Sequence, residues 1–275
     1  MAKKKATSKK TTVKVVSKEA KTEATTSKKV VLKKKSNSIV EQISKPKFIA
    51  SIAAEFVGTF LLAAAVIAGQ GQPLVVLFTL TAIVLVIGAT SGAHVNPLIT
   101  VWAWATRRIN SVKAVGYILA QILGSMLAFV VIKLFIDGAP ALSEEAIMYG
   151  QQAPSMFTAT AIPSGKEWFI LFAELLGSAI FAFSVAHTTS NKNNNSTAVA
   201  LGVGSGLFVA ALIANSAATI VGGGAILNPA VAISLQAFSV EGTNTLWAIA
   251  TYVGAALIGG IAGFAFSSLI SKNEK

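Results

Sequence analysis

Two asparagine–proline dipeptides, one in each half of the chain, are the residues whose types and spacing could do chemistry. Asn96 and Pro97 lie in SGAHVNPLITVW, and Asn228 and Pro229 lie in GGGAILNPAVAISLQ. Asparagine is a strong helix N-cap and proline is favoured at the first helical position. Each dipeptide therefore predicts a helix start, where an amide side chain can donate hydrogen bonds to a neutral solute.

The helices that follow the two prolines are predicted to be short. The apolar run ends before Arg107 in the first copy and before Ser239 in the second. Roughly ten residues cover about 15 Å, which is about half of a bilayer core. Glycines beside both motifs suit irregular backbone buried at membrane depth. The positive N-termini of two half-spanning helices would meet near the midplane, where they repel cations.

Together with AEFVGTF (54–60) and AELLGSAIF (173–181), these motifs resemble the aquaporin and aquaglyceroporin family, the major intrinsic proteins. The likeness covers roughly residues 48–270. It implies an all-α membrane protein with six transmembrane helices and two re-entrant half-helices in inverted repeats. It also implies channels for water and small uncharged solutes, usually assembled as a homotetramer with one pore per subunit. Within the two motifs, the resemblance assigns Asn96, Pro97, Leu98, Asn228, Pro229 and Ala230 to the pore.

Composition agrees with a polytopic membrane protein, since 53% of the 275 residues are hydrophobic. Without cysteine, no disulfide or thiolate metal site can form. The net charge of +12 lies in residues 1–47, which carry fifteen Lys and three Glu. This segment is expected to be a disordered cytoplasmic tail. It either fixes the topology or contacts anionic lipid.

Apolar runs and polar breaks divide the rest of the chain into two similar halves. The first repeat spans 48–136, an extracytoplasmic loop spans 137–167, the second repeat spans 168–270, and a cytoplasmic end covers 271–275. The expected spans are about 49–69, 74–91, 113–136, 168–189, 198–216 and 245–270. An odd number of spans in each half makes the second repeat inverted in the bilayer.

The orientation is predicted from Lys and Arg in the short flanks of the spans. The tail, Arg107, Arg108, Lys113 and Lys192 fall on one side, whereas Lys166 falls on the other. Both termini are therefore expected to be cytoplasmic, in a multi-pass protein of the cell (plasma) membrane.

Glu55 and Glu174 are the ionisable residues well inside spans, at equivalent places in the two repeats. Carboxylates in lipid are costly, so they could be proton relays of a transporter. The resemblance instead implies that they bind the backbone of the pore loops. His94 is assigned by the resemblance to the loop beside the pore, where water contact and plain packing both remain open. Its only histidine companion, His187, is predicted on another helix, so neither a metal nor another cofactor is expected.

The sequence departs from the family at the expected constriction. Val231 occupies the position where most members have arginine. Counting from the two asparagines places Val76, Ser216 and Ala225 beside it, with Ala217 as the alternative to Ser216. Such a constriction would be wide, weakly polar and without a fixed positive charge. Leu98 stands where alanine is usual and would place a bulkier apolar side chain beside the asparagines.

No residue cluster of an enzyme is visible, because the chain lacks cysteine, a histidine–carboxylate cluster and a phosphate-binding Gly–Lys loop. The prediction is a passive channel for water or small neutral solutes such as glycerol. Two alternatives stay open. One is a secondary transporter coupled to an ion gradient through Glu55 or Glu174, and the other is a membrane anchor that acts through its basic tail.

Overall fold

The structure is a computed structural model that describes residues 39–272. In this part of the chain, six helices are long and apolar enough to cross a membrane. They are α2 (Pro46–Ala68), α3 (Pro73–Ser91), α5 (Ser111–Asp137), α7 (Glu167–Ser190), α8 (Ser196–Ile220) and the continuous helix formed by α10 (Thr245–Ile249), η1 (Ala250–Ala255) and α11 (Ala256–Lys272). The predicted fold class is confirmed.

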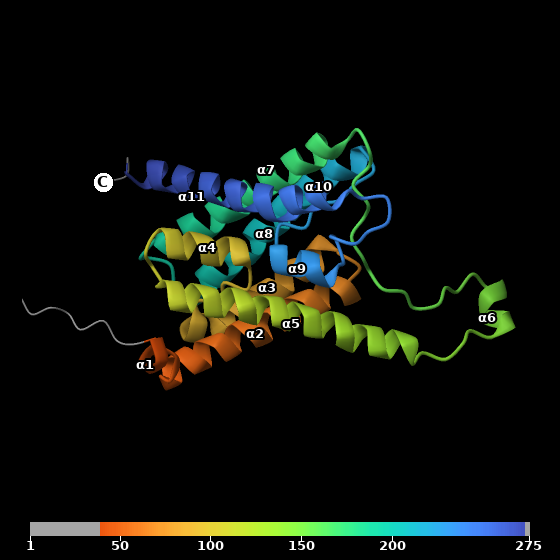
Figure 1. Cartoon of the computed structure of the whole chain (residues 1–275), viewed down its shortest axis with the longest axis horizontal. Coiled ribbons are helices and arrows are strands. Elements are labelled where there is room, and N and C mark those ends of the chain that lie inside the picture. Colours follow the sequence, from red (N-terminus) through yellow and green to blue (C-terminus); the bar gives the residue numbers. More distant parts are fainter. Residues whose placement is uncertain (1–38, 273–275) are drawn as a thin grey trace, which may run out of the picture. The chain divides into compact units, whose positions relative to one another are not determined.

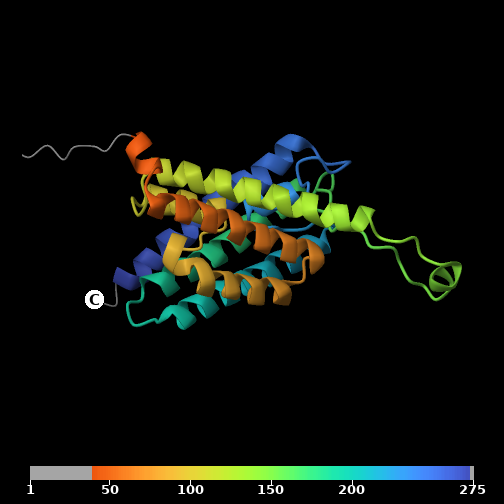
Figure 2. The same cartoon turned by 90° about the horizontal axis from the view of Figure 1, so that it is seen from below.

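The spans form a bundle whose helices run side by side (Figures 1 and 2). In the first half, α2 packs against α5 and α3, and in the second half α7 packs against α11 and α8. Helices α3 and α8 join the halves. The first and last described residues lie at one end of the bundle, which we call the terminal side, and the long connection through α6 lies at the other, the loop side.

Two short helices lie inside the bundle and begin at the asparagine–proline motifs, as predicted. Helix α4 (Pro97–Ala105) runs toward the terminal side, and α9 (Pro229–Ser234) packs against α5 of the opposite half. Each has proline at its start and an asparagine N-cap. The second is shorter than its apolar run predicts, because turns replace the helix after Ser234.

Small residues let the long helices approach each other closely. A Cβ atom on Gly124 would lie 2.3 Å from the backbone oxygen of Phe56, and one on Gly259 would lie 2.2 Å from that of Leu175. These two glycines occupy matching positions in the α2–α5 and α7–α11 contacts. The repeat of the sequence therefore becomes a repeat of the packing.

Three elements differ from the sequence expectation. Helix α1 (Ile39–Ile43) and the start of α2 lie within residues 39–47, so that part of the expected disordered tail is helical. Residues 1–38, and with them the proposed lipid contact, lie outside the described residues. The loop-side connection contains α6 (Glu144–Met148), whose N-cap is Ser143. The last span contains the π-helical turn η1, which the apolar pattern did not indicate.

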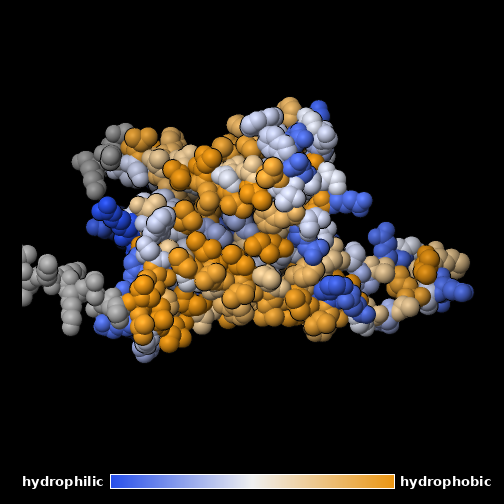
Figure 3. All heavy atoms as spheres, viewed as in Figure 1, coloured by the Kyte–Doolittle hydropathy of each residue, from blue (hydrophilic) through white to orange (hydrophobic). Residues whose placement is uncertain are grey.

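The outer surface of the bundle is apolar over the length of the spans, with polar residues toward both ends (Figure 3). Phe78, Val86 and Phe135 expose 65, 77 and 77% of their surface. Such exposure would favour aggregation in water, and it matches contact with lipid chains. The chain is thus a multi-pass membrane protein.

Candidate functional site

The two N-cap asparagines are linked to each other's loops by reciprocal hydrogen bonds. Asn96 Nδ2 donates to Leu227 O at 2.8 Å, and Asn228 Nδ2 donates to Val95 O at 2.9 Å. Their Oδ1 atoms accept from the first turns of α4 and α9, at Leu98 N and Ala230 N. An amide NH2 group has two hydrogens. Each asparagine therefore keeps a second N–H that can donate to a solute.

The residues before the asparagines have a left-handed backbone, with φ of 41° at Val95 and 60° at Leu227. This conformation is unfavourable for non-glycine residues, above all for β-branched valine. The backbone N–H of Val95 and that of Leu227 each donate to a glutamate. The backbone C=O of each of these residues accepts from an asparagine. The strained loops are thus fixed by long-range contacts.

The glutamates make the contacts that the resemblance implied. Glu55 accepts from the backbone N–H of His94 at 2.9 Å and of Val95 at 2.7 Å. Glu174 accepts from Ile226 N at 2.8 Å and Leu227 N at 2.7 Å. Both carboxylates are fully buried, so these charge-assisted bonds offset part of their desolvation cost.

Around His94 the first loop has additional side-chain contacts. Gln121 Nε2 bonds Glu55 Oε2 at 2.8 Å and Thr100 Oγ1 at 2.9 Å, and His94 Nδ1 lies 3.1 Å from the same hydroxyl. Burial lowers the pKa of the His94 imidazole, and the charges of Lys113 and Arg108 lower it further, whereas Glu55 opposes this effect. Burial thus disfavours the charged form of this ring.

Two cavities flank the asparagine pair. The loop-side cavity has a volume of about 110 Å³ and contacts Asn228, Gly224 and Ala225. The terminal-side cavity has a volume of about 200 Å³ and contacts Gly92, Ala93 and His94. A water molecule requires roughly 10–15 Å³ of such space, so each cavity has room for several.

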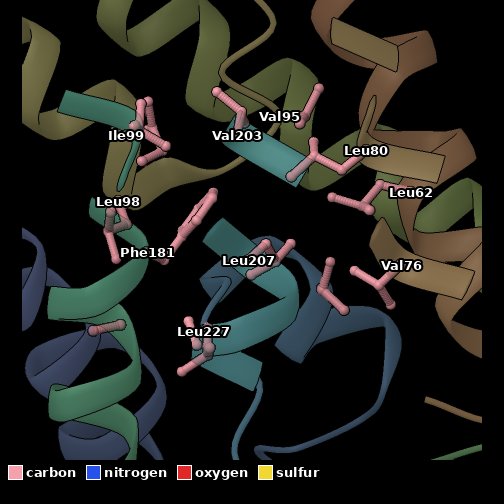
Figure 4. Close-up of a cluster of buried hydrophobic side chains, with 14 of the residues drawn as sticks. Leu62, Val76, Leu80, Val95, Leu98, Ile99, Phe181, Val203, Leu207 and Leu227 are labelled. Carbon is pink, nitrogen blue, oxygen red and sulfur yellow. The ribbon is translucent and has the colours of Figure 1, made fainter. Parts of the chain in front are cut away.

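Apolar side chains of the same two helices line both cavities. On α3, Val76 lines the loop-side cavity, and Leu80 and Val84 line the terminal-side cavity. On α8, Val203 lines the terminal-side cavity and Leu207 lines the loop-side cavity. Figure 4 shows Val76, Leu80, Val203 and Leu207 in one cluster with Leu62, Val95, Phe181 and Leu227. Because side chains four apart share a helix face, the two cavities lie along the same faces of α3 and α8.

Three of the four residues expected at the constriction line the loop-side cavity: Val76, Ala225 and Val231. The placement of Ser216 is wrong, and so is its alternative Ala217, because both are exposed on another face of α8. Asn215 lines the cavity instead. It continues the i, i+4 series of Leu207 and Ala211, whereas Ser216 lies about 100° further round the helix. This i, i+4 spacing identifies Asn215 from the sequence, whereas counting residues back from Asn228 does not.

Asn215 adds a polar group to this cavity. Its Oδ1 accepts from Ala225 N at 3.0 Å, which leaves the NH2 group as a donor. Tyr252, which also lines the cavity, donates from Oη to Gly224 O at 3.2 Å. The cavity therefore combines an apolar wall with one edge of amide and backbone groups.

Comparison with known proteins agrees with this geometry. The family model described as Major intrinsic protein matches residues 42–263. The chain belongs to the major intrinsic protein family. Members of this family are membrane channels, so the chain is a channel for water or small solutes.

Two curated members illustrate the range of the family. The chain is 30% identical to Glycerol uptake facilitator protein-like 6 of Lactiplantibacillus plantarum, over 76% of this chain and 92% of that protein. It is 24% identical to Nodulin-26 of Glycine max, over 83% of this chain and 80% of that protein. The structure of the aquaglyceroporin from Plasmodium falciparum superposes with a TM-score of 0.62 at 18% identity, covering 82% of this chain and 98% of that chain. This last likeness shows the fold.

Leu98, the departure within the first motif of this family member, lines neither cavity. Its side chain is 1% exposed and packs onto Gly260 of α11, where a Cβ atom would lie 2.8 Å from Leu98 Cγ. Leu98 therefore adds apolar bulk next to Asn96 but not to the lining of either cavity. The absence of a side chain at Gly260 leaves the room that leucine needs.

Gly260→Ala should consequently overpack this contact and lower stability by about 1–3 kcal/mol. We expect a lower thermal midpoint in detergent, measured by light scattering or intrinsic fluorescence. The double variant Leu98→Ala with Gly260→Ala should recover most of the loss. Gly88→Ala is the matched control, because its nearest neighbour lies at 3.8 Å. Equal midpoints for Gly260→Ala and Gly88→Ala would contradict this account.

Proposed function

We propose that the chain is a passive channel for water and small neutral solutes of the glycerol type, with a wide constriction that lacks arginine. The observation that carries the proposal is the position of the two cavities, which lie along the same apolar faces of α3 and α8 on either side of the paired asparagines. Relatives whose names refer to glycerol uptake and to an aquaporin support glycerol or water as the permeant.

The two faces of the path suit a solute that is itself amphipathic. Glycerol presents carbon atoms on one side and hydroxyl groups on the other. Its carbon side can lie against Leu80, Val203 and Leu207, while a hydroxyl oxygen accepts from the amide of Asn228, which lines the loop-side cavity. An ion would lose its hydration against the apolar wall without replacement, and this loss is costly.

The proposed constriction consists of Val76, Asn215, Ala225 and Val231. Three small or medium apolar side chains and one amide leave more room than a ring with arginine, so discrimination by size should be weak. Because Asn215 can donate to a hydroxyl or carbonyl oxygen, it favours polyols and amides over purely apolar molecules.

Val231→Arg tests the position of this constriction. A long cationic side chain in the loop-side cavity should reduce glycerol influx by about tenfold or more, because it narrows the path and adds a fixed charge. The measurement is stopped-flow light scattering on proteoliposomes with matched protein content.

Ser216→Arg provides the matched control for this substitution. The same side chain is introduced fifteen residues earlier in sequence but on an exposed face of α8, where arginine can extend to the membrane surface. We expect wild-type influx within about twofold, since the cavity is unchanged. Equal influx for Val231→Arg and the wild type, or a selective loss in Ser216→Arg, would place the constriction elsewhere.

The secondary transporter is the competing function, and the contacts of its candidate relays count against it. Each carboxylate uses both oxygens to bind loop N–H groups. A relay must exchange protons with the path, and protonation would weaken these bonds. We therefore assign Glu55 and Glu174 to loop support.

We further propose that both termini face the cytoplasm of the plasma membrane and that four copies assemble. The terminal side of the bundle carries Arg107, Arg108, Lys113 and Lys192, and such an excess is typical of the cytoplasmic side. The homotetramer rests on membership of the family. Cross-linking in native membranes and protease protection of the tail would test the two statements separately.

A further inference from the structure

This channel has no positive charge at position 231, but it has one at the terminal-side cavity. The loop-side cavity is lined by no Lys, Arg, Asp or Glu among the described residues. The terminal-side cavity is lined by Arg108 and by no other Lys, Arg, Asp or Glu among the described residues. Arg108 is thus the one lysine or arginine among the side chains described as lining the two cavities, and it lies on the terminal side.

Arg108 is held in place by its neighbours. Its guanidinium lies 4.0 Å from the ring centroid of Trp102, and Trp102 stacks on Phe264 at 3.5 Å. The backbone N–H of Arg108 donates to Ala103 O at 2.8 Å, just past the end of α4. A cation over an aromatic face and beside a helix C-terminus is favourably placed. The guanidinium thus lies over Trp102, although Arg108 as a whole is exposed.

No carboxylate of residues 39–272 forms an ion pair with Arg108. The described residues contain one ion pair, Lys133 with Asp137, far along α5 on the loop side. Glu55 is the acidic group of the nearby loop, and its oxygens accept from His94 N and Val95 N. Lys113 adds a second cation near His94, but its Nζ lies over the ring of Tyr117 and outside the cavity lining.

We propose that Arg108, fixed on Trp102, is a selectivity residue that repels cations at the terminal-side mouth and so compensates for the uncharged constriction at Val231. The inference rests on the proposed function, because it concerns what a channel for neutral solutes excludes. A fixed charge at the mouth of a low-dielectric path lowers the local concentration of cations while neutral solutes pass it unaffected.

The test compares cation and water permeability in the same proteoliposomes. Potassium influx is followed with a trapped potassium-sensitive dye, and water efflux is followed by light scattering. In Arg108→Gln, we expect the ratio of potassium to water permeability to rise by about tenfold at low salt, and by less at high salt because the charge is screened. Arg108→Lys keeps the charge and should retain most of the exclusion.

Arg107→Gln is the matched control. It removes the same charge one residue earlier, from an exposed side chain outside the cavity lining, and should leave the ratio at the wild-type value. A ratio in Arg108→Gln equal to that of Arg107→Gln would overturn the inference, as would equal leakage in Arg108→Lys and Arg108→Gln. Wild-type water and glycerol rates no greater than those of empty vesicles would instead refute the proposed function.

Discussion

Replacement of Glu174 by alanine is expected to cause the loss of most folded, flux-competent channel. The carboxylate is the acceptor for Ile226 N and Leu227 N in an interior that excludes water. An unsatisfied buried donor costs about 1–3 kcal/mol, so two of them cost about 2–6 kcal/mol. That is a large part of the stability of a typical protein. Leu227 would also lose support for its left-handed backbone, which accepts from Asn96.

The measurement is the yield of monodisperse protein in detergent, together with glycerol influx per reconstituted channel. Glu167→Ala serves as the control, since it removes a carboxylate from the first turn of the same helix, at the loop-side surface. We expect that change to cost at most about 1 kcal/mol. Normal yield and flux in Glu174→Ala would show that the loop does not depend on the carboxylate. Normal yield with loss of gradient-coupled transport would favour the transporter.

Asn228→Asp is the second substitution with a large expected effect. Aspartate keeps the N-cap acceptor for Ala230 N but replaces the Nδ2 donor with a charged oxygen. That oxygen would face Val95 O, now 2.9 Å from the amide nitrogen, and the second donor toward the path would also be lost. We expect water and glycerol permeability to fall by about tenfold or more, because a negative charge at this depth is poorly solvated and the loop must rearrange.

The control for this exchange is Asn195→Asp. Asn195 caps α8 through Oδ1, which accepts from Ala198 N at 2.8 Å, and it lies on the exposed terminal side. The same loss of an amide should leave permeability within about twofold, since aspartate caps as well as asparagine. If the two variants behaved alike, the amide at position 228 would have no special part in permeation.

Much of the architecture could be predicted because the bilayer restricts what a chain can do. Apolar runs of sufficient length become spans, and the asparagine–proline starts mark the half-helices. Glu55 and Glu174 were indicated by their position within otherwise uncharged spans. Gly124 and Gly259 follow Tyr117 and Tyr252 at the same spacing in the two halves, so the repeat of these glycines can be read from the sequence.

The remaining features depend on contacts between distant residues. Asn215, rather than Ser216, lines the cavity because the rotation of α8 is set by its packing on α3 and α7. Leu98 avoids the path because a glycine 162 positions later leaves it room on α11. The left-handed backbone of Val95 runs against the preference of valine and exists because Glu55 and Asn228 bind it. No local pattern contains that information.

The most direct test of the central claim is stopped-flow light scattering on proteoliposomes of the wild-type chain, with a trapped proton-sensitive dye. Water efflux and glycerol influx are measured with and without proton and sodium gradients. The account predicts that both rates are well above those of empty vesicles, independent of either gradient, and without proton leakage. Rates equal to those of empty vesicles, or glycerol uptake that requires an ion gradient, would contradict it.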